Sequence, residues 1–168
     1  IINEGITSVG RWSFTNCHAL KSIQLPNSLE TINYGAFALC ENLEYVNIPD
    51  NVTDIQGEAF GHCTKLKSVK LGDSVKSIGR LAFFCCESLK EITIPESVTS
   101  IDNGVFERCY SLTDATIYST VVGCSMFEYC NSLVNVYIGD NVENIEDRAF
   151  IFCNTLAYIN IGAGVKNI

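Results

Sequence analysis

His62 and Cys63 are neighbours in the stretch EAFGHCTKL (58–66), and their side chains are types that take part in chemistry. A thiolate activated by an imidazole is the nucleophile of cysteine hydrolases, and both side chains are common zinc ligands. Partners for such chemistry are scarce, because His18 is the only other histidine. Cys85 and Cys86 form a second adjacent pair among the nine cysteines. Whether either pair is a site depends on the pattern around it.

That pattern is an internal repeat through the whole chain. The step between repeats is 23 residues, with one step of 21 residues between Phe106 and Phe127. Phenylalanine recurs at positions 14, 37, 60, 83, 106, 127 and 150, cysteine at 17, 40, 63, 86, 109, 130 and 153, and leucine at 20, 43, 66, 89, 112, 133 and 156. The place of His62 is taken in the other repeats by Asn16, Leu39, Cys85, Arg108, Tyr129 and Phe152. A catalytic or metal-binding pair would not be repeated without its histidine. We therefore expect Cys63 to be architectural and His62 to be an exposed variable residue.

Other signatures of catalytic, cofactor or metal sites are missing from the sequence. There is no C-x2-C or H-x3-5-H pair for zinc and no D-x-[DN]-x-[DN]-G loop for calcium. Neither a glycine-rich phosphate loop nor a serine nucleophile elbow is present. The sequence therefore predicts a protein that is not an enzyme, with no catalytic residues, no cofactor and no metal.

The cysteines are predicted to be free thiols. Seven in one column cannot all pair with one another, and the total of nine leaves at least one unpaired. A free buried cysteine packs like a small hydrophobic residue, which suits a repeated core position. Cys85 and Cys124 lie outside the column. We expect Cys85 to face outward from its turn and to be the most reactive cysteine.

Each repeat is predicted to contain a strand, a turn, a second short extended piece and a short helical turn. In the repeat 89–111, Ile92 and Ile94 alternate with polar residues, which is the period-two signature of a strand with one buried face. Pro95 then ends the strand, because it lacks the N–H that a ladder requires. The stretch 105–109 carries Phe and Cys three residues apart, the spacing of one face of a helical turn.

A single repeat is too small to fold alone. About seven apolar side chains contribute on the order of 10–20 kcal/mol of burial. Ordering the backbone costs roughly 1–2 kcal/mol for each residue, which is more in total. Stacking the repeats closes the side-chain columns into a continuous core and pairs the strands. The sequence thus predicts a solenoid.

The repeat resembles the BspA-like, or Treponema-type, leucine-rich repeat, whose mark is L-x-x-I-x-I-P-x-S-V-x-x-I-G-x-x-A-F-x-x-C-x-x. The resemblance covers essentially the whole chain in seven consecutive Phe/Cys/Leu registers. It implies a curved leucine-rich-repeat solenoid, mainly β, with a parallel sheet on one face. We expect one domain over 1–168, with both terminal repeats incomplete and the chain a fragment of a longer protein. Proteins similar to this family are commonly cell-surface or secreted adhesion proteins, so the resemblance implies an extracellular location.

Charge and hydropathy bear on the partner. A formal charge of −8 with scattered Lys and Arg argues against nucleic acid. No apolar run reaches the roughly 18–20 residues that a membrane span needs, so direct membrane insertion is not expected. A protein, such as a host matrix or cell-surface protein, is the expected partner. Because solenoids need polar caps, the uncapped ends predict either end-to-end self-association or adjoining domains.

The outward side chains of the sheet are the predicted contact surface. If Ile23 and Leu25 point inward, two columns point outward along the whole stack. The first column is Ser22, Tyr45, Ser68, Glu91, Asp114, Asn135 and Tyr158, and the second is Gln24, Asn47, Lys70, Thr93, Thr116, Tyr137 and Asn160. Tyrosine is enriched at protein interfaces, although it also favours strands. The residues predicted to bind a partner are Tyr45, Asn47, Lys70, Glu91, Asp114, Asn135, Tyr137 and Tyr158. The alternative is a structural spacer or intracellular scaffold without a ligand of its own.

Two irregular features remain. The repeat with the 21-residue step contains the stretch IYSTVVGCSMF (117–127), in which Tyr118 takes the place of proline. There we expect Val121 and Val122 to stand where Val98 and Ile101 stand in the preceding repeat, in a locally tightened arc. Separately, apolar residues at variable places of the helical turn predict a second apolar patch, or a surface covered by flanking chain: Leu39, Phe84, Tyr129, Ile151 and Phe152.

Overall fold

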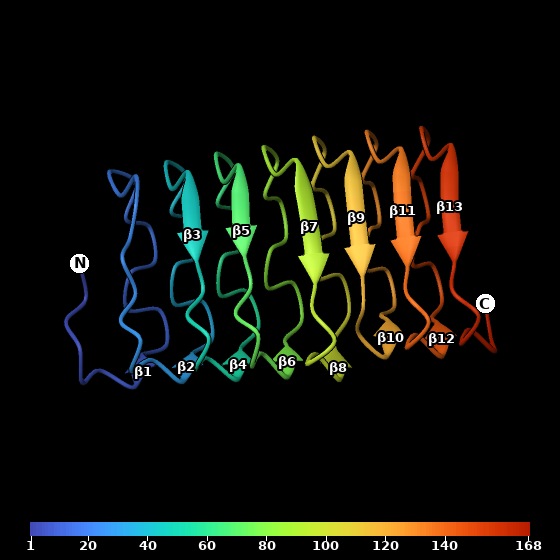
Figure 1. The fold of residues 1–168 in the computed structure, drawn as a ribbon. Helices are drawn as coiled ribbons and strands as arrows, with labels where there is room; N and C mark the ends of the chain where they lie inside the picture. Colours follow the sequence, from blue (N-terminus) through green and yellow to red (C-terminus); the bar gives the residue numbers. More distant parts are fainter.

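A computed structural model describes all 168 residues and shows a stack of similar rungs, each rung being one repeat (Figure 1). The strands of successive rungs lie side by side, and the two termini lie at opposite ends of the stack (Figure 1). Each complete rung has one main strand or extended segment, a turn, a two-residue strand and a run of turns that leads to the next rung. The predicted solenoid fold is confirmed.

The main strands lie parallel along one side of the stack, the first two paired as one sheet and the last four as another. Residues alternate between exposed and buried in the strands of the central rungs, because successive side chains of a strand point to opposite faces. An isolated bridge between Ser22 and Tyr45 joins the first rung to this side. The main strands are β3 (Tyr45–Asn47), β5 (Ser68–Lys70), β7 (Glu91–Ile94), β9 (Asp114–Ile117), β11 (Asn135–Ile138) and β13 (Tyr158–Ile161).

The two-residue strands form a second parallel ladder. One residue of each strand is buried and the other is at least partly exposed. The first five pair as one sheet and the last two as another: β1 (Ser8–Val9), β2 (Thr31–Ile32), β4 (Asp54–Ile55), β6 (Ser77–Ile78) and β8 (Ser100–Ile101), then β10 (Val121–Val122) and β12 (Asn144–Ile145).

The predicted helical turn is wrong in detail. The structure contains no α-helix, and therefore none that could cross a membrane. In the run of turns, alternate N–H groups donate to the next rung: Gly104 to Cys124 O, Phe106 to Met126 O and Arg108 to Glu128 O, at 2.8–3.0 Å. Groups that bond to a neighbouring rung cannot also form the i→i−4 bonds of a helix.

This third ladder requires left-handed backbone at fixed places of the repeat. Arg108 has φ of 61°, and His62, at the same place, has φ of 60°. Such a conformation costs of order 1 kcal/mol or more in a residue other than glycine, and it persists only when the surroundings impose it. Here the hydrogen bonds between rungs impose it.

The core is built from the repeated Phe, Cys and Leu columns. The phenylalanine rings stack face to face along the solenoid, with neighbouring centroids 5.2–5.7 Å apart. Each thiol from Cys40 onward in its column donates to the carbonyl of a phenylalanine in the preceding rung, as Cys63 Sγ does to Phe37 O at 3.3 Å. The column cysteine is therefore a hydrogen-bond donor as well as a filler of volume, and all nine cysteines are free.

The prediction for the short repeat is half wrong. Val122 pairs with Ile145 and so keeps the buried column of Ile101. The column of Val98 is filled by Ser119, because the carbonyl of Thr120, the residue after it, accepts from Glu143 N–H just as the carbonyl of Lys76, the residue after Val75, accepts from Thr99 N–H. Ser119 is fully buried, and its hydroxyl donates to Val121 O at 2.8 Å. The two missing residues therefore come from the exposed turn, and a hydroxyl replaces an apolar side chain in the core.

Candidate protein-binding face

The outward columns of the main sheet have the predicted registers. Tyr45 pairs with Ser68, and Asn47 with Lys70. Across the later strands, the series Glu91, Asp114, Asn135, Tyr158 runs in register, and Tyr137 lies between Thr116 and Asn160. The structure exposes all eight predicted contact residues on this one side: Tyr45, Asn47, Lys70, Glu91, Asp114, Asn135, Tyr137 and Tyr158. Their binding role stays a prediction.

The first part of this side, which we call the N-terminal face, comprises Glu44, Tyr45, Lys67 and Lys70. Lys67 Nζ lies 2.6 Å from Glu44 Oε2 and 5.7 Å from the centroid of the Tyr45 ring. The hydrogen bond from Lys67 lowers the pKa of Glu44, and the bond to Glu44 raises the pKa of Lys67. The cation, the carboxylate and the aromatic ring of this region thus engage one another.

The later part, which we call the tyrosine face, comprises Asp114, Tyr118, Asn135, Tyr137 and Tyr158. The rings of Tyr118 and Tyr137 pack with centroids 5.8 Å apart at an interplanar angle of 59°. Asn135 Nδ2 donates to Asp114 Oδ1 at 2.8 Å. Hydrogen bonds from the side chains of Thr113 and Asn135 lower the pKa of Asp114, so this carboxylate is ionised at neutral pH.

Tyr118 was not among the predicted contact residues. It follows β9 at the place where three other rungs have proline, and it is 42% exposed. Its ring lies over Gly139 of the next rung, where a Cβ would be only 2.9 Å from Tyr118 Cδ1. The only sequence signal was the missing proline in the short repeat, combined with a glycine at the equivalent place in the next repeat.

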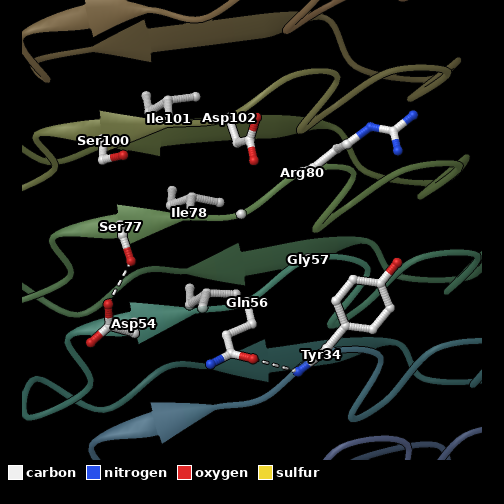
Figure 2. Close-up of a pocket in the computed structure, with 12 residues that line it drawn as sticks. Tyr34, Asp54, Gln56, Gly57, Ser77, Ile78, Arg80, Ser100, Ile101 and Asp102 are labelled. Atoms are coloured by element: carbon white, nitrogen blue, oxygen red, sulfur yellow. Dashed lines mark hydrogen bonds between the residues drawn. The ribbon is translucent and has the colours of Figure 1, made fainter.

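A groove of about 570 Å³ runs along the second ladder (Figure 2). Gly57 and Gly79 line it, and a Cβ on either would approach the neighbouring rung, to 2.9 Å from the Tyr34 ring for Gly57 and to 2.5 Å from Gly57 N for Gly79. Its polar groups largely bond within the protein: Ser77 Oγ donates to Asp54 Oδ1 at 2.6 Å, and the Tyr34 N–H donates to Gln56 Oε1 at 3.2 Å (Figure 2). The groove is therefore explained by the packing of the rungs.

The predicted second apolar patch is divided by packing within the run of turns. The rings of Tyr129 and Phe152 stack at 4.6 Å, and Arg108 lies over both Phe84 and Tyr129 at 5.5 and 5.7 Å from the ring centroids. Leu39 instead lines a small pocket of about 310 Å³ that also includes Phe84. Only Phe152 among the predicted patch residues is largely exposed.

The prediction that Cys85 is exposed is wrong. The side chain is only 7% exposed, and burial raises the pKa of its thiol. The reason is that Cys85 is the smallest member of its column and stands between the larger side chains of His62 and Arg108. His62 is exposed, as predicted. Cys124, at the short repeat, is partly exposed. No group of three His, Cys, Asp or Glu side chains is arranged to hold a metal ion.

Comparison with known proteins agrees with this architecture. The family model for the BspA type leucine rich repeat region matches in six copies, over residues 1–113 and 62–168. The chain belongs to this BspA-type family. Among solved structures, this BspA-type chain is similar to a leucine-rich repeat protein of Treponema pallidum, with 28% identity and a TM-score of 0.84 over 92% of this chain and 74% of that one.

Two further solved structures share the BspA-type architecture. A leucine-rich repeat protein of Bacteroides ovatus is 25% identical, with a TM-score of 0.62, and the match covers 99% of this chain and 55% of that protein. A leucine rich cell surface protein of Faecalibacterium prausnitzii is 20% identical, with a TM-score of 0.59 over 93% and 69% of the two chains, a likeness that shows the fold alone. A search of curated proteins found no match.

Proposed function

We propose that this chain is a protein-binding module that contacts its partner through the exposed side of the main sheet. The observation that carries the proposal is the pair of outward columns, which run in register from β3 to β5 and from β7 through β9 and β11 to β13. These columns include three exposed tyrosines: Tyr45 at 54%, Tyr137 at 43% and Tyr158 at 70%. Tyrosine provides contact area together with a polar hydroxyl, which suits a surface that is exposed to solvent in the free protein and buried in the complex.

The contrast between constant inward residues and variable outward residues of each repeat supports this proposal. The inward residues of the main strands from β3 to β11 are constrained by the core, since they are all buried, small or branched apolar side chains. The outward residues vary from rung to rung in charge, size and aromaticity. A repeat architecture with a constant core and a variable face can bind a partner without changing its fold. Family membership supports the same role, with adhesion at the cell surface as the proposed setting.

The test is a binding assay with this chain as bait against a panel of matrix and cell-surface proteins. A variant with Tyr45→Ala, Tyr137→Ala and Tyr158→Ala is expected to lose the captured partner. The matched control carries Lys76→Ala and Thr99→Ala, which change exposed residues beside the second ladder, and it should keep the partner. Thermal unfolding of both variants checks that the fold is intact.

A partner kept by the tyrosine variant but lost by the control would move the binding site to the second ladder. Capture of no protein from the panel would favour a spacer role over a binding role. The two outcomes can be distinguished, because a misplaced binding site still yields a captured partner, whereas a spacer yields none.

A further inference from the structure

Three tyrosines gather on the later rungs of the sheet. Tyr118, Tyr137 and Tyr158 follow one another on successive rungs and are 42%, 43% and 70% exposed. Tyr118 directly follows β9 in the irregular repeat, and Gly139 leaves room for its ring beside Tyr137. An extended chain that crosses the rungs would meet one aromatic ring on each.

The cations of the protein avoid this region. No lysine or arginine occurs between Arg108 and Arg148. The same segment contains six carboxylates: Asp114, Glu128, Asp140, Glu143, Glu146 and Asp147. The residue that precedes each strand shows the same change along the stack. It is charged at Lys21, Glu44, Lys67 and Lys90, and then uncharged at Thr113, Val134 and Ala157.

Aromatic rings elsewhere in the molecule are already occupied by cations. Arg11 lies over Tyr34 at 5.6 Å, Lys67 over Tyr45 at 5.7 Å, and Arg108 over both Phe84 and Tyr129. These are all the cation–ring contacts in the structure, so no cation of the chain lies over Tyr118, Tyr137 or Tyr158. The tyrosine face therefore presents π surfaces with ionised Asp114 on the neighbouring column and nothing of opposite charge between them.

We propose that the tyrosine face binds an extended, lysine- or arginine-bearing segment of the partner protein. The basic side chains would lie against the rings of Tyr118 and Tyr137, and Asp114 would attract their charge. Cations are attracted to the face of an aromatic ring, and carboxylates beside the ring add to that attraction. The proposal rests on the proposed function and specifies the chemistry of the partner.

The test uses the whole chain and two labelled synthetic peptides, one in which lysine alternates with serine and one in which glutamate alternates with serine. The lysine peptide should bind, weaken as salt is added, and outbind the glutamate peptide. A variant with Tyr118→Ser and Tyr137→Thr should weaken its binding by about threefold or more, as should Asp114→Asn. The residues introduced at Tyr137 and Asp114 already occur in the same columns, at Thr116 and Asn135, so the fold should tolerate them.

The matched control is Tyr110→Ser, which removes an exposed tyrosine that lies in the run of turns, outside the main sheet. It should leave binding of the lysine peptide unchanged. Equal binding of both peptides, no binding of either, or an equal loss in Tyr110→Ser would overturn the proposal. If the panel protein is captured through the sheet but the lysine peptide fails, the basic partner is wrong and the binding module stands. If both fail, the proposed function fails as well.

Discussion

The N-terminal face and the tyrosine face share one backbone and one core but differ in what they leave unpaired. Both have parallel strands in the same register over the same Phe and Cys columns. On the N-terminal face, Lys67 engages both Glu44 and Tyr45. On the tyrosine face, the rings of Tyr118 and Tyr137 engage only each other, and no cation lies between them and Asp114. The same scaffold can therefore carry a self-satisfied surface and an open one a few rungs apart.

The comparison teaches that the core constrains the face very little. Adjacent strands are about 4.8 Å apart, so residues of one outward column are always close enough to interact. Which interactions form depends only on the residue types at each place. In the short repeat, an exposed tyrosine stands at the place where three other rungs have proline, and this single change of residue type alters the chemistry of the face.

The largest expected effect is a difference in stability between core substitutions in a regular rung and in the short rung. Val98→Ser should lower the free energy of unfolding by about 2–4 kcal/mol, because it removes buried methyl groups and buries a hydroxyl. Ser119→Val at the same column should change it by only about 1 kcal/mol, since new apolar burial offsets the lost bond to Val121 O. Urea denaturation of both variants measures the difference. Equal losses would show that the short rung is packed like the others.

Alkaline pH should act on both regions alike. Burial raises the pKa of the column thiols, to about 11 for Cys40 and about 12 for Cys153. Because folding raises the pKa of these thiols, protonated thiols favour the folded state. This contribution to the free energy of unfolding is complete below the unfolded pKa, near 9, and is lost as pH rises through the folded pKa. The urea midpoint should therefore fall between about pH 9 and 12. Cys63→Ala and Cys109→Ala, one from each region, should reduce this fall equally. An undiminished fall would assign it to other groups.

Thiol labelling should distinguish the short rung from a regular rung. Cys124 is partly exposed, whereas Cys85 is buried and its thiol has a raised pKa. Reaction with iodoacetamide at neutral pH should therefore modify Cys124 at least about tenfold faster than Cys85, because thiolate fraction and access set the rate. Peptide mapping by mass spectrometry follows both sites. Faster labelling of Cys85 would mean that its turn opens in solution, and Cys124→Ser serves as the control.

Placing a lysine on the tyrosine face, at the place that Lys67 has on the N-terminal face, should make the two faces more alike in their binding of a basic peptide. Val134 precedes β11 at the place that Lys67 has before β5. In Val134→Lys, we expect the new cation to pair with Asp114 and to repel a basic peptide, which should weaken its binding a few-fold. Val134→Gln is the uncharged control of similar length, and fluorescence titration gives both affinities. Unchanged binding in Val134→Lys would contradict the role given to Asp114.

The smallest effect is expected from Lys67→Ala. The Lys67–Glu44 pair is 51% and 33% exposed in its side chains. An exposed ion pair of this kind contributes little to stability, because water screens it, and added salt reduces it further. Thermal unfolding should shift only slightly, and the shift should shrink at high salt. A large, salt-independent loss would show that the aliphatic stem of Lys67, packed near Tyr45, matters more than its charge.

The errors of the sequence-based predictions have one physical origin. The helical turn, the exposed Cys85 and the place of Val121 were all inferred from neighbours along the chain. Each is decided instead by neighbours in adjacent rungs: Arg108 N–H donates to Glu128 O, Cys85 stands between His62 and Arg108, and Glu143 N–H donates to Thr120 O. The strands were predicted correctly because alternation along a strand is a local signal.

The sequence by itself determined the repeat, the inward and outward registers of each strand and the solenoid class, because a periodic apolar pattern has only one way to form a continuous core. It also determined which residue types stand in each outward column. Only the tertiary structure decided which of those residues are free. Pairing across rungs depends on side-chain reach and ring orientation, and these placed Lys67 over Tyr45 while leaving Tyr118 and Tyr137 open beside Asp114.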